Sequence, residues 1–187
     1  MSMVAANPNL RIDWVIMSAN ETRKLEAEKS FAAWFPGLKH AQITFCSFSD
    51  SFFPWQGMEI KQELHRLASV CEPDLILTTR RKDMHQDHRL LSELTWNAFR
   101  NHLIWEYEIP KYDGDLGNPN LFFPLAEEIA RSKIKLLMSH FKTQQSKSWY
   151  RPETFESLMR IRGIECNAPS GFSEGFHANK MCLAASS

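Results

Sequence analysis

Short apolar runs alternate with longer amphipathic segments along the first two thirds of the chain. The runs at residues 12–17, 42–48, 75–78 and 103–109 are rich in β-branched, leucine or aromatic residues, and each predicts a strand. Between these runs the apolar residues recur at helical spacing, as they do over residues 60–71. Repeated strand and helix pairs favour an α/β fold, with a mostly parallel sheet that carries helices on both faces.

Local signals refine the ends of these elements. The segment Ser18-Ala-Asn-Glu21 offers a capping box for the first helix. Residues 111–120 are dense in turn formers and too long for a tight turn, so they predict a surface loop near a site. Beyond this loop the pattern predicts a helix over residues 130–141, a shorter helix that ends at Gly163, and an edge strand within residues 178–183.

Composition restricts the class of protein. The 187 residues include 43% hydrophobic residues, enough to form a core, and no linker divides them, so we expect a single domain over residues 1–187. Lys and Arg number 22 against 22 Asp and Glu, and this balance argues against nucleic acid as the main partner. No apolar run approaches the roughly 18 residues that span a bilayer, and no basic and apolar leader opens the chain. We therefore expect a cytoplasmic protein with no membrane partner.

The cysteines argue against a zinc knuckle or a thioredoxin-type motif, because Cys46, Cys71, Cys166 and Cys182 are far apart and form no CxxC. We expect four reduced thiols.

One segment carries the chemistry of most interest. Asp83-Met-His85-Gln-Asp87-His88 lies between a predicted strand and a predicted helix, at the edge of an α/β sheet where ligands bind. Two imidazoles three residues apart suit one metal ligand and one acid or base, and a carboxylate between them can fix a tautomer. The alternative is structural: Asp87 is then the N-cap of a helix that begins at His88, and both histidines are exposed. Two histidines alone are too few to hold catalytic zinc.

Two further polar residues occupy similar positions in the strand and helix pattern. Arg23 lies in the first turn of the first helix and Asp50 follows the second strand, so both are candidates for the same crevice. The alternatives are an ion pair of Arg23 with Glu26 on the helix surface and a simple turn role for Asp50.

The segment from Pro73 through His88, with the helix that follows it, resembles the PIG-L/LmbE-like deacetylases. These are zinc hydrolases that remove acetyl groups from N-acetylated amino sugars and their conjugates, and they have a Rossmann-like α/β fold. Weaker matches follow in the order that the family shows, from about residue 12 to the C-terminus: Arg23-Lys-Leu-Glu26-Ala, Phe48-Ser-Asp50, Glu108-Ile-Pro-Lys-Tyr-Asp-Gly-Asp115, Ser139-His-Phe-Lys-Thr-Gln144, Arg160-Ile-Arg-Gly163 and Ser173-Glu-Gly-Phe176.

The resemblance implies a role for each candidate residue. Zinc in that family is held by the last His of the HxxH pair, here His88, and by a His and an Asp from an N-terminal His-Pro-Asp-Asp motif. The first His of the pair, here His85, assists as acid and oxyanion stabiliser, and Asp87 would orient it. Substrate contacts map onto Arg23 and Asp50.

The chain departs from the family at its start, because it contains no His-Pro-Asp-Asp and opens at the family's second strand. We expect that the first β-α unit, on the order of 30 residues, is missing and that the domain is N-terminally incomplete. Two of the three zinc ligands and the general base would be missing with it. A sheet edge exposed in this way has unpaired backbone groups that can bond to another chain, which leads us to expect a homo-oligomer.

Three hypotheses follow. The first is a zinc-dependent hydrolase that deacetylates an acetamido sugar or a related glycoconjugate, with the 111–120 loop selecting this small-molecule substrate. The second is a non-catalytic carbohydrate-binding or interaction module derived from that fold. The third is a hydrolase with a different metal constellation.

Overall fold

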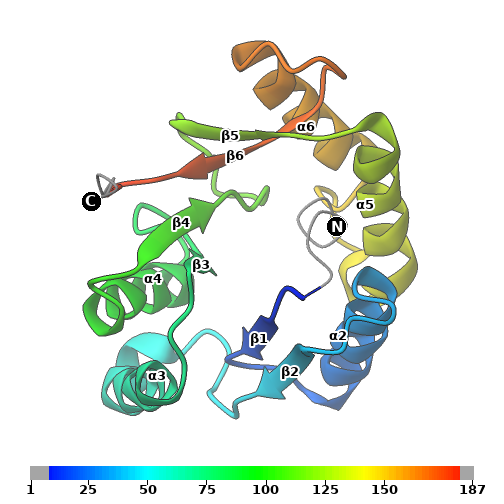
Figure 1. The fold of residues 1–187 in the computed structure, drawn as a ribbon. Helices are drawn as coiled ribbons and strands as arrows, with labels where there is room; N and C mark the ends of the chain where they lie inside the picture. Colours follow the sequence, from blue (N-terminus) through cyan, green and yellow to red (C-terminus); the bar gives the residue numbers. More distant parts are fainter. Residues whose placement is uncertain (1–8, 182–187) are drawn as a thin grey trace. The chain divides into compact units, whose positions relative to one another are not determined.

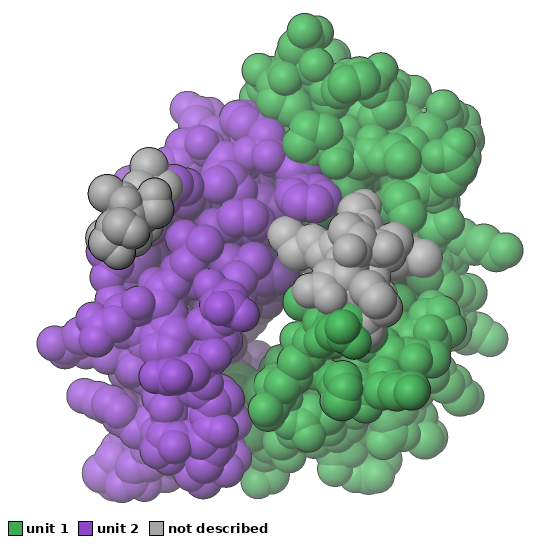
Figure 2. All heavy atoms as spheres, in the orientation of Figure 1, with its two compact units in different colours: residues 1–47, 124–174 green, residues 48–123, 175–187 purple. Residues whose placement is uncertain are grey.

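The structure of the chain is a computed structural model that describes residues 9–181 (Figure 1). Its contacts divide the chain into two compact units, residues 1–47 with 124–174 and residues 48–123 with 175–187 (Figure 2). The described strands are β1 (Ile12–Ile16), β2 (Ala41–Phe45), β3 (Leu75–Thr78), β4 (Leu103–Tyr107), β5 (Leu121–Pro124) and β6 (Ser173–His177). The helices are α2 (Glu21–Trp34), α3 (Gly57–Val70), α4 (Gln86–Ala98), α5 (Glu127–His140) and α6 (Pro152–Glu165), with short 3-10 turns η1 (Phe53–Gln56) and η2 (Lys142–Gln144).

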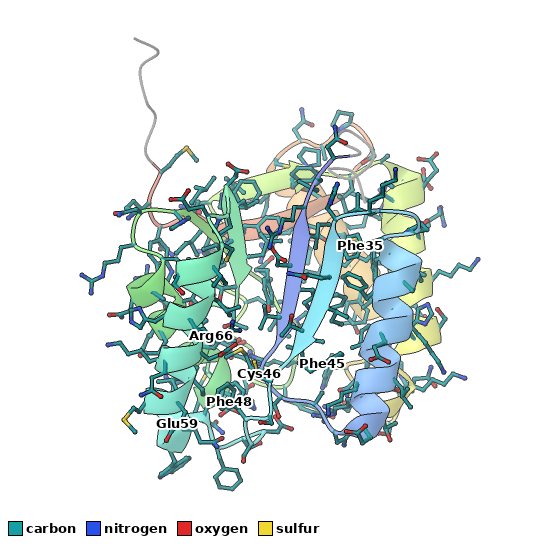
Figure 3. The ribbon with its side chains drawn as sticks, turned by 60° about the horizontal axis from the view of Figure 1, so that its bottom comes forward. Phe35, Phe45, Cys46, Phe48, Glu59 and Arg66 are labelled. Carbon is teal, nitrogen blue, oxygen red and sulfur yellow. The ribbon has the colours of Figure 1, made fainter. Side chains whose placement is uncertain are left out.

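The first unit is built on a β-α-β element. Strands β1 and β2 are parallel, with Ile12 opposite Ala41, and α2 connects them and packs beside β2 (Figure 3). The side chain of Asn20 caps α2 by accepting a hydrogen bond from the Arg23 N–H at 2.9 Å. The predicted helix is confirmed, but its cap is Asn20 rather than Ser18, because Asn20 directly precedes the first helical residue.

Helices α5 and α6 complete this unit. Helix α5 packs against both α2 and α6. The buried Tyr150 joins them, since its hydroxyl donates to the Leu137 carbonyl at 2.8 Å and its ring meets that of Phe155 at 5.3 Å. Glu26 accepts hydrogen bonds from the backbone N–H and the hydroxyl of Thr143, at 2.9 and 2.6 Å.

Helix α6 does not end at Gly163 as the sequence predicts, but continues to Glu165. A Cβ at Gly163 would lie 2.2 Å from the carbonyl oxygen of Gly171. The glycine therefore serves the close approach of the following loop to the helix rather than a helix end.

The second unit contains His85-Gln-Asp-His88, which we call the HxDH segment. Strands β3 and β4 are parallel, with Thr78 opposite Glu106, and β6 runs antiparallel to β4, with His177 opposite Glu106. The sheet order is β3-β4-β6-β5, and the boundary between the units falls within β5 and β6. Helices α3 and α4 pack on one another, and η1 packs on both.

The mixed α/β class is confirmed, with parallel pairing in both sheets. The described residues form two sheets rather than one, and β5 and β6 were not predicted. The described part of the expected edge strand, residues 178–181, is not a strand, while residues 182–183 lie outside the described residues. A single domain over residues 1–187 stays a prediction.

Two further expectations concern the helices and the thiols. No helix within residues 9–181 is long and apolar enough to cross a membrane. Cys46, Cys71 and Cys166 are reduced thiols within the described residues, as expected, and Cys182 lies outside them.

Candidate active site

A tight turn leads from β3 into α4. The Asp83 N–H donates to the Arg80 carbonyl at 3.0 Å, and the Asp83 carboxylate accepts from the His85 N–H at 2.8 Å. The Thr79 hydroxyl donates to the His88 carbonyl at 2.7 Å. Aspartate favours such bonds to the backbone two residues on, so this local chemistry fixes the path of the HxDH segment.

Helix α4 begins at Gln86, and its N-cap is His85. The predicted alternative, in which Asp87 caps a helix that begins at His88, is therefore wrong. The Nδ1 atom of His85 accepts a hydrogen bond from the Asp87 N–H at 3.3 Å, which is the bond that a cap side chain supplies.

The two imidazoles stack and have opposite hydrogen-bond roles. Their centroids lie 4.6 Å apart with an interplanar angle of 30°. Nδ1 of His88 lies 3.1 Å from a carboxylate oxygen of Asp83 and donates to it, whereas Nδ1 of His85 accepts from a backbone N–H. In neutral rings this places the proton on Nε2 of His85 and leaves a lone pair on Nε2 of His88. The pair thus presents one donor and one acceptor.

Asp83 is the buried anchor of this arrangement. Besides His88, it contacts the ammonium group of Lys111 at 3.2 Å, and its side chain is 4% exposed. Burial alone would raise its pKa, but hydrogen bonds from His88 and His85, with the charges of His88 and Lys111, lower the pKa to about 2. Asp83 therefore remains a carboxylate.

The 111–120 loop folds against the HxDH segment, as expected of a loop near a site. Lys111 also pairs with Asp115, and the Asp115 carboxylate accepts from the Met84 N–H at 2.6 Å. Burial works against ionisation of Asp115, but these two hydrogen bonds lower its pKa overall. Nearby, burial and the charge of Asp83 raise the pKa of Tyr107 to about 12, so this phenol keeps its proton.

Asp87 does not aim its carboxylate at an imidazole. Its two oxygens accept from the N–H groups of Ser51 and Phe53, at 2.6 and 3.1 Å, and it is buried. The prediction that this carboxylate orients His85 is therefore wrong, because both of its oxygens accept from backbone N–H groups. The backbone N–H of Asp87 bonds to the His85 ring instead. Asp87 instead fixes the segment after β2 to the first turn of α4.

The substrate-contact candidates lie in different units. Asp50 is an exposed turn residue next to Ser51, whose N–H donates to Asp87, and it lies in the same unit as the imidazoles. Arg23 lies in the first turn of α2, in the unit of residues 1–47 and 124–174. A substrate role for either residue stays a prediction.

The described residues do not form a zinc site. Residues 9–181 contain no group of three or more His, Cys, Asp or Glu side chains able to hold a metal ion, whereas catalytic zinc takes three protein ligands. Asp83 is the carboxylate next to His88, and it is already engaged by His88 and Lys111.

Sequence reasoning missed Asp83 as the partner of His88, and it missed Lys111 and Tyr107 as neighbours of Asp83. A signal for Asp83 was present, because an aspartate two residues before His85 can bond to the backbone N–H there. No local signal connects Lys111 to this segment, because the contact spans 28 residues of chain.

Comparison with known sequences places the β1 to α4 region in a family. The sequence model described as "PIG-L: GlcNAc-PI de-N-acetylase" matches residues 6–99, which include the HxDH segment. A search of curated proteins finds no match.

Several solved structures share the fold. The conserved protein TT1542 from Thermus thermophilus aligns with a TM-score of 0.71 at 16% identity, over 98% of this chain and 88% of that one. GalB, the 4-carboxy-2-hydroxymuconate hydratase from Pseudomonas putida KT2440, aligns with a TM-score of 0.67 at 14% identity, over 98% and 90%. N,N'-diacetylchitobiose deacetylase from Pyrococcus horikoshii aligns with a TM-score of 0.64 at 16% identity, over 92% and 74%. At such identities the likeness shows the fold, and the proteins that share it include both a hydratase and a deacetylase.

Proposed function

Because the chain belongs to the GlcNAc-PI de-N-acetylase (PIG-L) family, we propose that it is a hydrolase that removes the acetyl group from an N-acetylated amino sugar or a related glycoconjugate. Deacetylases are also among the proteins that share its fold.

The observation that carries this proposal is the opposed hydrogen bonding of the two stacked imidazoles. Backbone and carboxylate partners at Nδ1 give His85 an Nε2–H donor and His88 an Nε2 lone pair. Amide hydrolysis needs a hydrogen-bond donor at the carbonyl oxygen, where negative charge develops, and a donor and an acceptor side by side suit that chemistry.

We assign the hydrogen-bond donor role to His85. Its Nε2–H would donate to the acetamide oxygen as negative charge develops there, and the ring would keep its proton. The leaving amine would take the proton that the attacking water releases, by way of the general base. Asp87 supports this role through its N–H on His85 Nδ1, and so acts as a positioning residue. We assign the role of general base to none of the described residues.

His88 is the residue we assign to a metal, with zinc as the metal that the family resemblance implies. Asp83 fixes its ring through Nδ1, the second-sphere arrangement common among metal-binding histidines. Within residues 9–181 no group of three suitable side chains occurs, so His88 is the one described residue that we assign as a ligand. Arg23 and Asp50 are proposed substrate contacts.

Acetate release from a panel of N-acetylated amino sugars, with and without added zinc, tests the proposal on the full chain. We expect His85→Ala to lower kcat by at least about 100-fold, the lower end of what one oxyanion donor contributes. We expect His88→Ala to abolish bound zinc, measured by plasma mass spectrometry. His65→Ala is the matched control, because His65 is an exposed histidine on α3 in the same unit.

Two results would reject the assignment: unchanged acetate release in His85→Ala, or equal zinc content in His88→Ala and the parent chain. Saturable binding of an acetamido sugar without any acetate release would instead favour the non-catalytic carbohydrate-binding module.

A further inference from the structure

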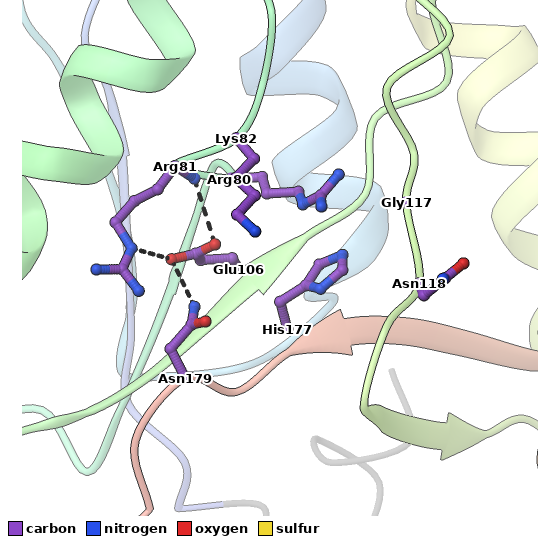
Figure 4. A pocket seen from close by; sticks show the side chains of 8 residues that line it. All are labelled: Arg80, Arg81, Lys82, Glu106, Gly117, Asn118, His177 and Asn179. Atoms are coloured by element: carbon purple, nitrogen blue, oxygen red, sulfur yellow. Dashed lines mark hydrogen bonds and ion pairs between the residues drawn. The ribbon is translucent and has the colours of Figure 1, made fainter.

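A hollow of about 640 Å³ lies beside the candidate active site within the second unit (Figure 4). This volume is within the range of about 300–1,000 Å³ typical of small-molecule sites. It is lined by Arg80, Arg81 and Lys82 from the loop after β3, by Glu106 from β4, and by His177 and Asn179 at the end of β6.

One of the three cations in this hollow is already neutralised. Glu106 is 2% exposed, and its carboxylate accepts from the Arg81 side chain at 2.9 Å and from the Arg81 N–H at 3.2 Å. The Trp96 indole and the Asn179 amide donate to the same carboxylate at 2.8 and 2.9 Å. Arg81 and Glu106 therefore build the wall of the hollow.

The other two cations have no such partner. Within residues 9–181, neither Arg80 nor Lys82 forms an ion pair with a carboxylate. Arg80 is held by a bond from Nη1 to the Asp115 carbonyl, and it lies so close to Gly117 that a Cβ there would meet its Nη2 at 2.5 Å. In Figure 4 the side chains of Arg80 and Lys82 point into the same space as the ring of His177.

We propose that this hollow is a binding site for the phosphate group of a small molecule. Two uncompensated cations match the charge of about −1.5 to −2 that a phosphate monoester carries near pH 7. Arginine, with its fork of donors, and lysine, as a mobile point charge, are the usual partners of phosphate. His177 and Asn179 add polar side chains that suit the phosphate oxygens or the group that carries them.

The place of Arg80 connects this hollow with the candidate active site. Arg80 also lines a narrow second hollow together with Asp83, Tyr107 and Lys111. The proposal concerns binding, so it stands or falls independently of deacetylation.

Isothermal titration of the full chain with three probes tests it: inorganic phosphate, N-acetylglucosamine and N-acetylglucosamine 6-phosphate. We expect both phosphate compounds to bind, with affinities that fall as salt is raised, since the attraction lies at a solvent-open site. Arg80→Gln and Lys82→Gln should each weaken phosphate binding by about tenfold, a typical loss for one charged hydrogen bond. Lys61→Gln is the matched control, because Lys61 is an exposed lysine on α3 in the same unit.

Lys82 is exposed, so Lys82→Gln tests the site even where Arg80→Gln disturbs the fold. Weaker binding of both phosphate compounds by the Lys82 variant, with the control unchanged, supports the proposal. The ratio of the two parent affinities then separates free phosphate from phosphate carried on a sugar. No binding of either compound, equal binding of the sugar with and without its phosphate, or binding unchanged by both variants would each overturn the site.

Discussion

The two units of the chain bury charge in different ways. In the second unit three carboxylates are almost fully buried, those of Asp83, Asp87 and Glu106, at 4%, 3% and 2% exposure. The buried charged side chain of the described part of the first unit is Arg162, and its partner Glu165 is 40% exposed. A buried charge lowers the stability of the fold unless it is fully hydrogen-bonded. A cluster of buried charges therefore marks a region where the chain maintains many specific hydrogen bonds.

The three carboxylates of the second unit also differ from one another. Asp87 accepts from two backbone N–H groups and Glu106 from Arg81, Trp96 and Asn179, so both hold structure together. Asp83 alone of the three contacts an imidazole. The comparison separates carboxylates that maintain the fold from the one that directs a reactive ring.

The largest expected effect is on stability, at Glu106. Replacing Glu106 by Ala leaves the Arg81 guanidinium, the Trp96 indole and the Asn179 amide without their acceptor. We expect a loss of about 3–5 kcal/mol in the free energy of unfolding, because several part-buried donors lose their acceptor at about 1–3 kcal/mol each. Urea denaturation monitored by tryptophan fluorescence measures it.

Glu165→Ala is the comparison variant in the first unit. Water can reach the site of Glu165, but Arg162 is buried and loses one charged hydrogen-bond partner, so we expect a loss of about 1.5–3 kcal/mol. Equal losses for the two variants would contradict the contrast between the units.

The next effect is on activity, at Asp83. Asp83→Asn keeps the shape of the turn but removes the charge that favours a proton on Nδ1 of His88. By analogy with second-sphere residues of metal sites, we expect kcat/KM to fall by about 10–100-fold, with metal affinity falling by a similar factor. Asp87→Asn should mainly lower stability, and a larger loss of kcat/KM in that variant would reverse the roles assigned to the two aspartates.

Much of the fold was predictable because its signals are local. The strand at residues 75–78 was predicted with the bounds the structure shows, since a compact apolar run lies between Pro73 and polar residues. Strand β6 was missed, because Ser173–His177 contains a glycine and polar residues, and its pairing with β4 is decided by tertiary contacts.

The candidate site was predictable only in part for the same reason. His85 and His88 lie within one turn, so their spacing indicated that they act together. The role of Asp87 was misjudged, because its acceptors are used by backbone groups more than 30 residues earlier in the chain. Lys111 and Glu106 carry no pattern of their own, and only the fold brings them to Asp83 and Arg81.

The smallest expected effect is in the first unit, at Tyr150. Tyr150→Phe removes the hydroxyl that donates to the Leu137 carbonyl, and we expect a loss of about 1 kcal/mol near pH 7, the usual value for one neutral hydrogen bond. Burial and the charge of Glu26 raise the pKa of Tyr150 to about 12 from its ordinary value of 10.0. Between these two pH values the folded chain holds a proton that the unfolded chain releases, so the contribution of Tyr150 to stability is full below pH 10 and is lost as pH rises toward 12.

The Tyr150→Phe variant has no phenol at this position, so its stability does not depend on this ionisation. The stability gap between the parent chain and Tyr150→Phe should therefore close as pH rises above 10, which urea denaturation at pH 7, 9, 10 and 11 measures directly. A gap that stays constant through this range would mean that the phenol is not protected from ionisation. The packing around Tyr150 would then tolerate a negative charge, as the second unit does at its three buried carboxylates.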